Sequence, residues 1–376
     1  MNLIKKTKAL IKDLVFIFLF IFIVLEVSAF ILSFFNMLPF NDAPSFYKHE
    51  KVISYKEWLT EELDWGAWHK PNQIVSHNTN CFSAKYNSNE IGAKDSSIEK
   101  KFLHKSTYIL LGDSFAEGYG VNNKDSSQNL IQEKTGINIL NFGTSGDFGP
   151  IQYAVIYSKL ASKYNHEGLI IYFLPANDFV DNDYNIWKSK SISEQKRWRP
   201  YFKKTSENNF TWFIPENAVK FSNNISRINV AENYLWLNNF YKTFKLIRLT
   251  FLNKNKKVLD SYSGYFSPTE EQQKAAVFFI DKIMSESKAS KIILISIPRP
   301  QDISRVYNGA DKNKMLWYQL FKTSSSRLQK KIVFIDLLDY LPKENINNIF
   351  YQCDGHWNAY GNKWAADVIS SKINAQ

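Results

Sequence analysis

Hydrophobic residues first gather in one long run near the start of the chain. Residues 14–35 are apolar except for Glu26 and two serines. These 22 residues are enough to cross a bilayer as a helix. Four lysines stand within residues 1–13, and a basic flank of this kind stays in the cytoplasm. The pattern predicts a cytoplasmic tail at 1–13 and a transmembrane signal anchor at 14–35. The remainder is expected outside the cytoplasm, in the periplasm of a Gram-negative cell.

A cleaved signal peptide is the alternative interpretation of the same run. Val27-Ser28-Ala29 offers the small residues of a cleavage site. The apolar run continues for six residues beyond Ala29, which favours an uncleaved anchor. Glu26 is costly in lipid unless it is paired or lies near the interface, which leaves association of the helix with a partner open.

Residues 36–105 follow without a clear helical or strand period, and we interpret them as a linker and a peripheral N-terminal segment. Trp58, Trp65 and Trp68 stand there in a polar setting. Such rings either stack on sugars or anchor the segment on the main domain, and the sequence favours anchoring.

From residue 106 to residue 375, short apolar runs alternate with helical patterns. Strands are predicted at Thr107–Leu111, Ile137–Asn141, Gly168–Leu174, Lys291–Ile297 and Lys331–Asp336. Helices are predicted at Ser127–Thr135, Pro150–Tyr164, Thr269–Lys288, Lys314–Gln329 and Asn362–Ile373. Short strands that alternate with helices indicate an α/β domain with a parallel, doubly wound sheet covered on both faces.

The alternation stops between about residues 179 and 267. This stretch holds the basic and aromatic run Arg197–Phe202 and an aromatic-rich helical segment at about 228–252. An insertion after the third strand lies near the carboxyl edge of the sheet. We interpret it as a lid or substrate-binding insert, with simple packing on the core as the equal alternative.

The first candidate reactive residue stands shortly after the strand Thr107–Leu111. Gly112-Asp113-Ser114 follows it, and a serine at this edge of an open α/β sheet is well placed to react. A hydroxyl needs a base before it attacks, and the candidate base lies in Asp354-Gly355-His356. Two more polar blocks stand between these, Asn141–Asp147 and Ala176-Asn177-Asp178.

These four blocks, in this order, resemble those of the SGNH hydrolases, also called GDSL-type esterases. The resemblance covers about residues 85–375. Asn89–Asp95 is similar to a segment of membrane-anchored members, although Lys94 replaces their arginine. The resemblance implies a flavodoxin-like three-layer sandwich with a five-stranded parallel sheet for residues 106–375.

The resemblance also implies a catalytic triad. Ser114 is the expected nucleophile, His356 the general base and Asp354 the residue that orients the imidazole. The family spacing is Asp-x-x-His, whereas this chain has Asp-x-His and carries Cys353 three residues before the histidine. The remaining histidines are expected to be surface or packing residues: His49, His69, His77, His104 and His166.

The same resemblance implies an oxyanion hole. Its donors are the backbone N–H groups of Ser114 and Gly146 and the side-chain amide of Asn177. Pro175 stands where the family commonly has a glycine. Asp113 is expected to cap or brace the turn at the serine, and Asp178 to be structural.

The charge and the number of cysteines limit the classes of partner and cofactor that the sequence predicts. The net charge of +11 comes from 47 basic and 36 acidic residues, but no basic stripe interleaved with aromatic residues appears, so no nucleic-acid partner is predicted. The charge suits an acidic glycan or a membrane surface, and compositional bias explains it equally well.

Cys81 and Cys353 are too few for a metal site, and either form a disulfide or are unrelated thiols. No P-loop or dinucleotide fingerprint occurs, and no cofactor is predicted.

Two functions remain open at this point. The first is a serine esterase or O-acyltransferase, which acts through an acyl-enzyme on ester-linked acyl groups of envelope or exported polysaccharide, with lipid esters as the second choice. The alternative is a catalytically silent glycan-binding or assembly module of the cell envelope. The complete set of candidate site residues favours the enzyme.

Overall fold

The computed structural model describes most of the chain, in segments. These are residues 2–34, 46–49, 52–53, 58–62, 64–78, 82–99, 106–188, 199–216, 262–342, 346–351 and 354–374. The chain divides into two compact units. The first contains residues 1–42 and 227–260, and the second contains residues 43–226 and 261–376.

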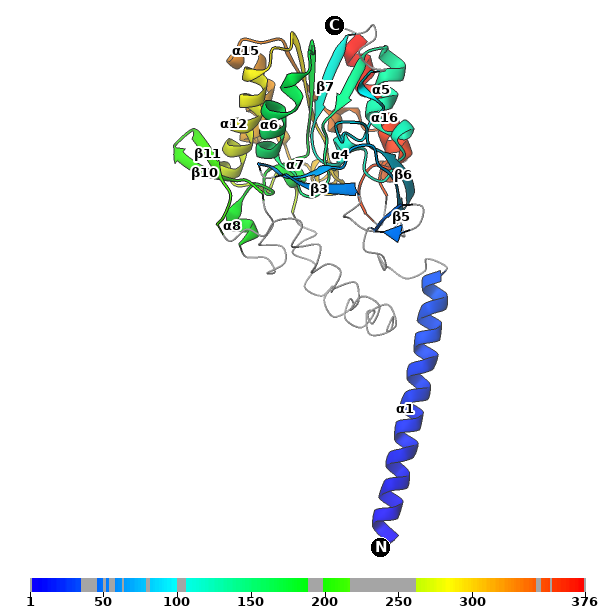
Figure 1. Cartoon of the computed structure of the whole chain (residues 1–376). Coiled ribbons are helices and arrows are strands. Elements are labelled where there is room, and N and C mark those ends of the chain that lie inside the picture. Colours follow the sequence, from blue (N-terminus) through cyan, green and yellow to red (C-terminus); the bar gives the residue numbers. More distant parts are fainter. Residues whose placement is uncertain are drawn as a thin grey trace. The chain divides into compact units, whose positions relative to one another are not determined.

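The first unit contains the helix α1 (Asn2–Phe34), which Figure 1 shows as one continuous helix. Its sequence holds neither glycine nor proline, the residues that most disfavour a helix interior. Most of the apolar side chains described on it are exposed, and Phe16 and Phe18 are each 70% exposed. Among the residues that the structure describes, no helix reaches both the length and the apolarity of a bilayer span. The predicted span at 14–35 lies partly outside those residues.

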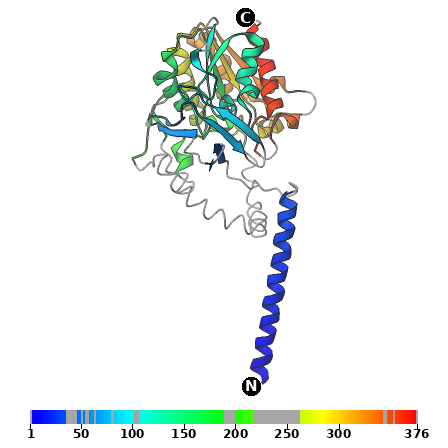
Figure 2. The same cartoon turned by 45° about the vertical axis from the view of Figure 1, so that its right-hand side comes forward.

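The second unit is organised around a five-stranded sheet, shown in Figures 1 and 2. Its strands are β7 (Thr107–Leu111), β8 (Asn138–Asn141), β9 (Gly168–Phe173), β12 (Lys291–Ser296) and β13 (Ile332–Asp336). They lie in the order β13-β12-β9-β7-β8, and every neighbouring pair is parallel. This is the flavodoxin-like order, in which the second strand of the chain lies outside the first. The predicted five-stranded parallel sheet is confirmed.

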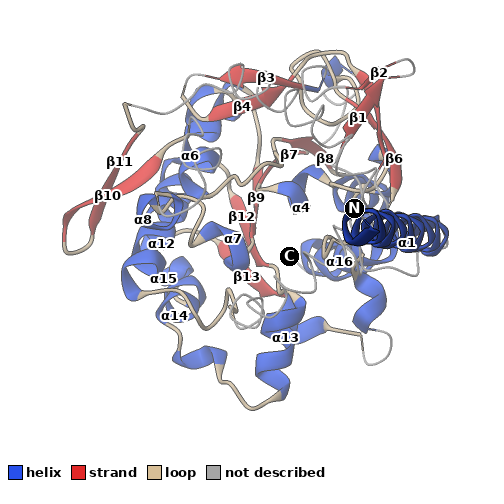
Figure 3. Cartoon of the chain, turned by 90° about the horizontal axis from the view of Figure 1, so that it is seen from below, coloured by secondary structure: helices blue, strands red, loops and turns tan. Residues whose placement is uncertain are grey.

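Helices cover both faces of this sheet because its strands are apolar on both sides. Every residue of β7 is buried, with Ile109 in the core on one face and Tyr108 in the core on the other. One face carries α6 (Pro150–Lys159), α12 (Glu270–Glu286), α14 (Leu316–Lys322) and α15 (Ser324–Leu328). The other carries α5 (Ser127–Thr135), α13 (Pro300–Tyr307) and α16 (Ala359–Asn374). Figure 3 shows α6, α12, α14 and α15 on the opposite side of the strands from α13 and α16.

Several helices begin and end where local chemistry requires. The Thr269 side chain accepts the N–H of Gln272, and the Gln272 side chain accepts the N–H of Thr269, so α12 starts with a capping box. Gly136 ends α5 in the left-handed conformation. The shorter elements are α4 (Ser114–Glu117), α7 (Pro175–Asp178), α8 (Tyr184–Trp187) and the 3-10 turns η1 (Asn123–Asp125), η2 (Ala161–Lys163), η4 (Lys312–Lys314), η5 (Leu337–Tyr340) and η6 (Ile346–Ile349).

The peripheral N-terminal segment contains strands that its sequence pattern does not predict. One sheet has the order β2-β1-β5-β6 and a second pairs β3 with β4. Their bounds are β1 (Phe46–His49), β2 (Val52–Ile53), β3 (Leu59–Glu62), β4 (Gly66–His69), β5 (Ile74–Asn78) and β6 (Ser83–Asn87). β4 is buried along its whole length, so the alternation that marks a half-exposed strand is missing there.

The three tryptophans of this segment anchor it on the domain. Trp58, Trp65 and Trp68 are 0%, 6% and 4% exposed, and the Trp68 ring stacks on that of Phe142 in the main domain, with their centroids 6.1 Å apart. Rings buried this deeply offer no face to a sugar, so the anchoring interpretation is the correct one.

The insertion is described in part. It includes α8 and a hairpin of β10 (Tyr201–Ser206) and β11 (Asn209–Phe213). The helical segment predicted at 228–252 lies outside the described residues, as do Cys81 and Cys353.

The central sheet generates a stability prediction. Ile171 in β9 is fully buried, so Ile171→Ala should lower the free energy of unfolding by about 2–5 kcal/mol through lost burial and the cavity left behind. Urea denaturation of the full chain, followed by tryptophan fluorescence, measures the change. Ile74→Ala is the control, because Ile74 is 48% exposed and its loss should cost less than about 1 kcal/mol. Equal costs at the two positions would contradict the assigned core.

Candidate active site

Ser114 stands at the start of α4, directly beyond the carboxyl end of β7. The carboxylate of Asp113 caps this short helix by accepting the N–H of Phe115 at 3.0 Å, which confirms its predicted role. Gly118 ends the helix with φ of 77°, and its N–H donates to the carbonyl of Ser114. A Cβ at Gly118 would lie 2.8 Å from the Cβ of Ser126, so only glycine fits there. The chain thus turns sharply on both sides of the serine.

His356, which comes from the C-terminal part of the chain, lies next to this serine. Its Nε2 atom lies 2.8 Å from the Ser114 hydroxyl oxygen, across 242 residues of sequence. Its Nδ1 atom hydrogen-bonds the Asp354 carboxylate, and the same carboxylate oxygen accepts the backbone N–H of His356 at 3.1 Å. Gly355 adopts φ of 83°, which lets the chain fold back between them. The short Asp-x-His spacing therefore still brings the carboxylate to the imidazole.

The electrostatics of Asp354 suit an orienting carboxylate. Burial alone would raise its pKa, but the hydrogen bond and the charge of His356 outweigh burial and hold the pKa below its usual value. Asp354 is therefore ionised at neutral pH. An ionised carboxylate at Nδ1 favours the tautomer that keeps a proton there, which leaves Nε2 free to accept the serine proton.

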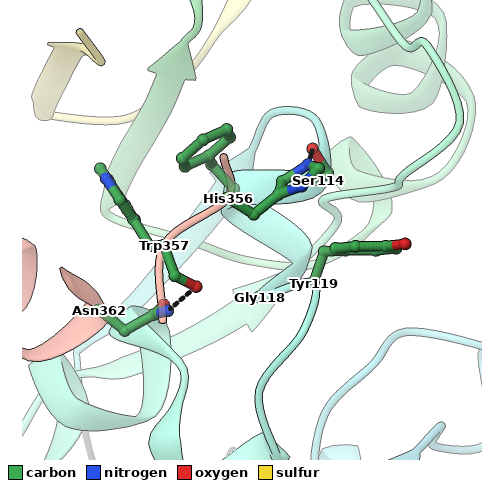
Figure 4. A pocket seen from close by; sticks show the side chains of 7 residues that line it. Ser114, Gly118, Tyr119, His356, Trp357 and Asn362 are labelled. Atoms are coloured by element: carbon green, nitrogen blue, oxygen red, sulfur yellow. Dashed lines mark hydrogen bonds between the residues drawn. The ribbon is translucent and has the colours of Figure 1, made fainter. Parts of the chain in front are cut away.

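Two aromatic rings lie close to the imidazole of His356. The centroid of its ring lies 5.1 Å from that of Phe115 and 4.5 Å from that of Tyr119. Figure 4 shows His356 and Tyr119 beside Ser114, in the pocket that these residues help to line. The side chains of His356 and Asp354 remain 21% and 19% exposed. The lining residues are Ser114, Phe115, Gly118, Tyr119, His356, Trp357 and Asn362.

Side-chain hydrogen bonds hold the start of the last helix, α16, in place. The side-chain oxygen of Asn362 accepts the N–H of Ser127 at 2.9 Å, which joins the start of α16 to the start of α5. The side-chain oxygen of Asn358 accepts the N–H of Gly361 at 3.0 Å, which stabilises the start of α16. The loop that carries His356 is thereby held at its C-terminal side.

The predicted oxyanion donors lie in the loops that flank Ser114. β7 lies between β8 and β9 in the sheet, Gly146 follows β8, and Asn177 follows β9 within α7. Gly146 adopts φ of 108°, and a Cβ there would meet no atom within 4 Å, so this residue borders open space. Their role as donors stays a prediction.

Two buried acidic residues, Asp178 and Asp113, stabilise the segments that follow β9 and β7. Asp178 accepts the N–H of Leu174 at 2.9 Å and the hydroxyl of Tyr153 at 2.7 Å, which agrees with its predicted structural role. Burial and the nearby charge of Asp113 raise the pKa of Asp178. Burial also raises the pKa of Asp113, to about 6.

Lys94 is buried, which the sequence did not indicate. Lys94, which replaces the arginine of the resembling segment, donates to the carbonyls of Gly118 and Val121, the latter at 2.9 Å. Its ammonium also lies 3.8 Å from the centroid of the Tyr86 ring. Burial lowers its pKa to about 7. The lysine thus holds the loop after α4, which carries Tyr119.

Comparisons with known proteins were made on the sequence and on the fold. No protein-family model and no curated protein sequence matches this chain. Among solved structures, a lipase/acylhydrolase from Enterococcus faecalis is similar, at 12% identity and a TM-score of 0.38 over 72% of this chain and 96% of that chain.

Two further solved structures are similar. A carbohydrate esterase family 2 enzyme with its carbohydrate binding domain, from Corynascus thermopiles (Myceliophthora fergusii), aligns at 14% identity and a TM-score of 0.38 over 72% of this chain and 66% of that chain. A lipolytic protein of the G-D-S-L family from Veillonella parvula aligns at 11% identity and a TM-score of 0.32 over 70% and 94%. At these identities and TM-scores, the similarities assign neither an activity nor a substrate to this chain.

The raised pKa of Asp113 predicts a pH-dependent stability. Between its ordinary pKa of 3.8 and about 6, the folded state keeps a proton that the unfolded chain has released, so the free energy of unfolding falls as pH rises through this window. Asp113→Asn keeps an acceptor for Phe115 but does not titrate. Relative to the wild type, the variant should gain about 3 kcal/mol as pH rises from about 4 to 7. Urea midpoints across this range test it, and a difference that is constant with pH would contradict it.

Proposed function

We propose that the protein is a serine esterase or O-acyltransferase that works through an acyl-enzyme. The proposal depends on the contacts of one imidazole. The Ser114 hydroxyl oxygen lies 2.8 Å from His356 Nε2, and Nδ1 of the same ring is hydrogen-bonded to the ionised carboxylate of Asp354. A serine hydroxyl next to an oriented imidazole is the arrangement that activates a weak nucleophile.

The chemistry proceeds in two halves. His356 Nε2 takes the proton of Ser114 while the serine oxygen attacks the ester carbonyl carbon. The tetrahedral intermediate then collapses, the bond to the alcohol oxygen breaks, and His356 returns the proton to that oxygen. In the second half, His356 takes a proton from water or from an acceptor hydroxyl, whose oxygen attacks the acyl carbon. The bond from that carbon to the Ser114 oxygen then breaks, and His356 returns the proton to Ser114.

Negative charge on the carbonyl oxygen needs donors in both halves. We assign this role to the backbone N–H groups of Ser114 and Gly146 and to the Asn177 amide. The strand order supports the assignment, because the loops after β8 and β9 border the strand that ends at the serine.

Hydrolysis and transfer share the acyl-enzyme and differ only in the acceptor. The partial exposure of His356 supports access of water. A transferase needs, in addition, an acceptor hydroxyl that is bound in place of water.

The location of the enzyme indicates the substrate class. We propose that residues 14–35 anchor the chain in a membrane, with the tail at 1–13 in the cytoplasm and the catalytic domain on the other side. The exposed apolar side chains of α1 support an apolar environment for that helix. An anchored esterase outside the cytoplasm meets acylated envelope or exported polysaccharides first, and lipid esters second.

Hydrolysis of p-nitrophenyl acetate tests the proposed activity. The full chain, kept dispersed in a mild detergent, should turn the ester over, and Ser114→Ala should lose about 10³-fold or more in kcat/KM because the nucleophile is gone. Ser371→Ala is the matched control, since the Ser371 hydroxyl is exposed and bonds only within α16. Equal rates in the wild type and Ser114→Ala would overturn the proposal.

Loss of one oxyanion donor has its own kinetic signature. Asn177→Ala should lower kcat by about 10²–10³-fold and change KM little, because the amide acts on charge that develops only in the transition state. Asn185→Ala, at an exposed position of α8, should leave both constants unchanged. An unchanged kcat in Asn177→Ala would remove this amide from the oxyanion hole.

A further inference from the structure

Two buried charged side chains hold the residues on either side of Gly146. Glu117, the last residue of α4, accepts both the backbone N–H and the hydroxyl of Ser145 with one carboxylate oxygen. On the other side, Nη1 of Arg199 donates to the backbone carbonyl of Asp147 at 2.6 Å. The N–H assigned to the oxyanion hole thus lies between two charge-assisted bonds, which are stronger than neutral ones.

Glu117 connects this loop to the helix of the nucleophile. It is fully buried and three residues beyond Ser114 in the same short helix. Burial would raise its pKa, but His69, Lys94 and the bond from Ser145 outweigh burial and lower the pKa. His69 Nε2 lies 3.6 Å from the other carboxylate oxygen. The carboxylate is therefore charged and fixes Ser145 relative to Ser114.

Arg199 connects the same loop to the insertion. It is 2% exposed, and its guanidinium carbon lies 3.4 Å from the centroid of the Trp187 ring. Its Nε donates to the Tyr201 hydroxyl at 3.2 Å. Trp187, Arg199 and Tyr201 all belong to the stretch predicted as an insertion, at 179–267. The guanidinium therefore reaches the loop from a support that the insertion provides.

The backbone at this point needs such support. Asp147 adopts φ of 62° although it is not glycine, a conformation that such residues seldom adopt. Gly146 next to it adopts φ of 108° and meets no atom where a Cβ would stand. A loop in these conformations, next to open space, keeps one geometry only if its neighbours impose it.

We infer that Glu117 and Arg199 are positioning residues that fix the Gly146 N–H for the oxyanion, and that Arg199 makes this geometry depend on the insertion. The inference rests on the proposed esterase function. The insertion then has a direct effect on the chemistry, because it holds one side of the oxyanion loop in addition to any part in binding substrate.

Three substitutions test the role of the two residues. Arg199→Met removes the donor to Asp147 and keeps an apolar chain on Trp187, and Glu117→Gln removes the charge and keeps the shape. Both should lower kcat by about 10- to 10²-fold with little change in KM, since a displacement of about 1 Å at a catalytic group has costs of this size. Arg199→Lys keeps a donor and should recover part of the loss. Arg327→Met is the control, because Arg327 bonds Asp281 on the helix α12 and should leave kcat unchanged.

A transition-state analogue separates positioning from simple stability. A trifluoromethyl ketone forms a tetrahedral adduct whose oxygen occupies the oxyanion hole. Across the variants, its inhibition constant should rise in proportion to the fall in kcat/KM, and thermal midpoints should show no such proportion. An unchanged inhibition constant in folded Arg199→Met and Glu117→Gln, with wild-type kcat, would overturn the inference and leave the esterase intact. A wild-type chain with neither turnover nor ketone binding that depends on Ser114 would overturn the proposed function itself.

Discussion

One hydrogen bond, between the Ser114 hydroxyl and His356, joins positions 242 residues apart, and the candidate active site depends on it. The bond forms because a parallel sheet brings the carboxyl ends of its strands to one edge. Ser114 lies at this edge because it follows β7, and His356 lies there in the loop before α16. The side chain of Asn362 hydrogen-bonds the start of α16 to the start of α5. The Asp-Gly-His turn then supplies the carboxylate without another element, since Gly355 allows the reversal of the chain.

Around this bond the domain buries charges that a packed core would exclude. Glu117, Lys94 and Asp113 are at most 2% exposed, and each unpaired buried charge would cost several kcal/mol, on the order of 3–5. Each is compensated by bonds to backbone: Glu117 on Ser145, Lys94 on the loop after α4, and Asp113 on the start of α4. The compensation fixes the loops next to the serine in place, so stability and site geometry depend on the same contacts.

The sequence predicted the parts of the fold that follow from local patterns. β7, β9 and β12 are continuous apolar runs, and α12 carries its own start signal at Thr269, so each was found within a few residues. In the small N-terminal sheets, β1 to β4 were missed because they are two to four residues long and β4 is buried on both sides. Glu117 was missed because its partners, Ser145 and His69, lie 28 and 48 residues away, and only the folded chain brings them together.

Labelling by a fluorophosphonate probe tests the central claim most directly, because the reagent reacts with a serine only where a base activates it. The full chain should acquire one phosphonyl group, located on Ser114 by mass spectrometry, and the labelling rate should fall by about 10³-fold or more in His356→Ala. Absence of an adduct on Ser114, or labelling that is equally fast without His356, would contradict an activated serine. The same fold would then be better explained as a binding module of the cell envelope.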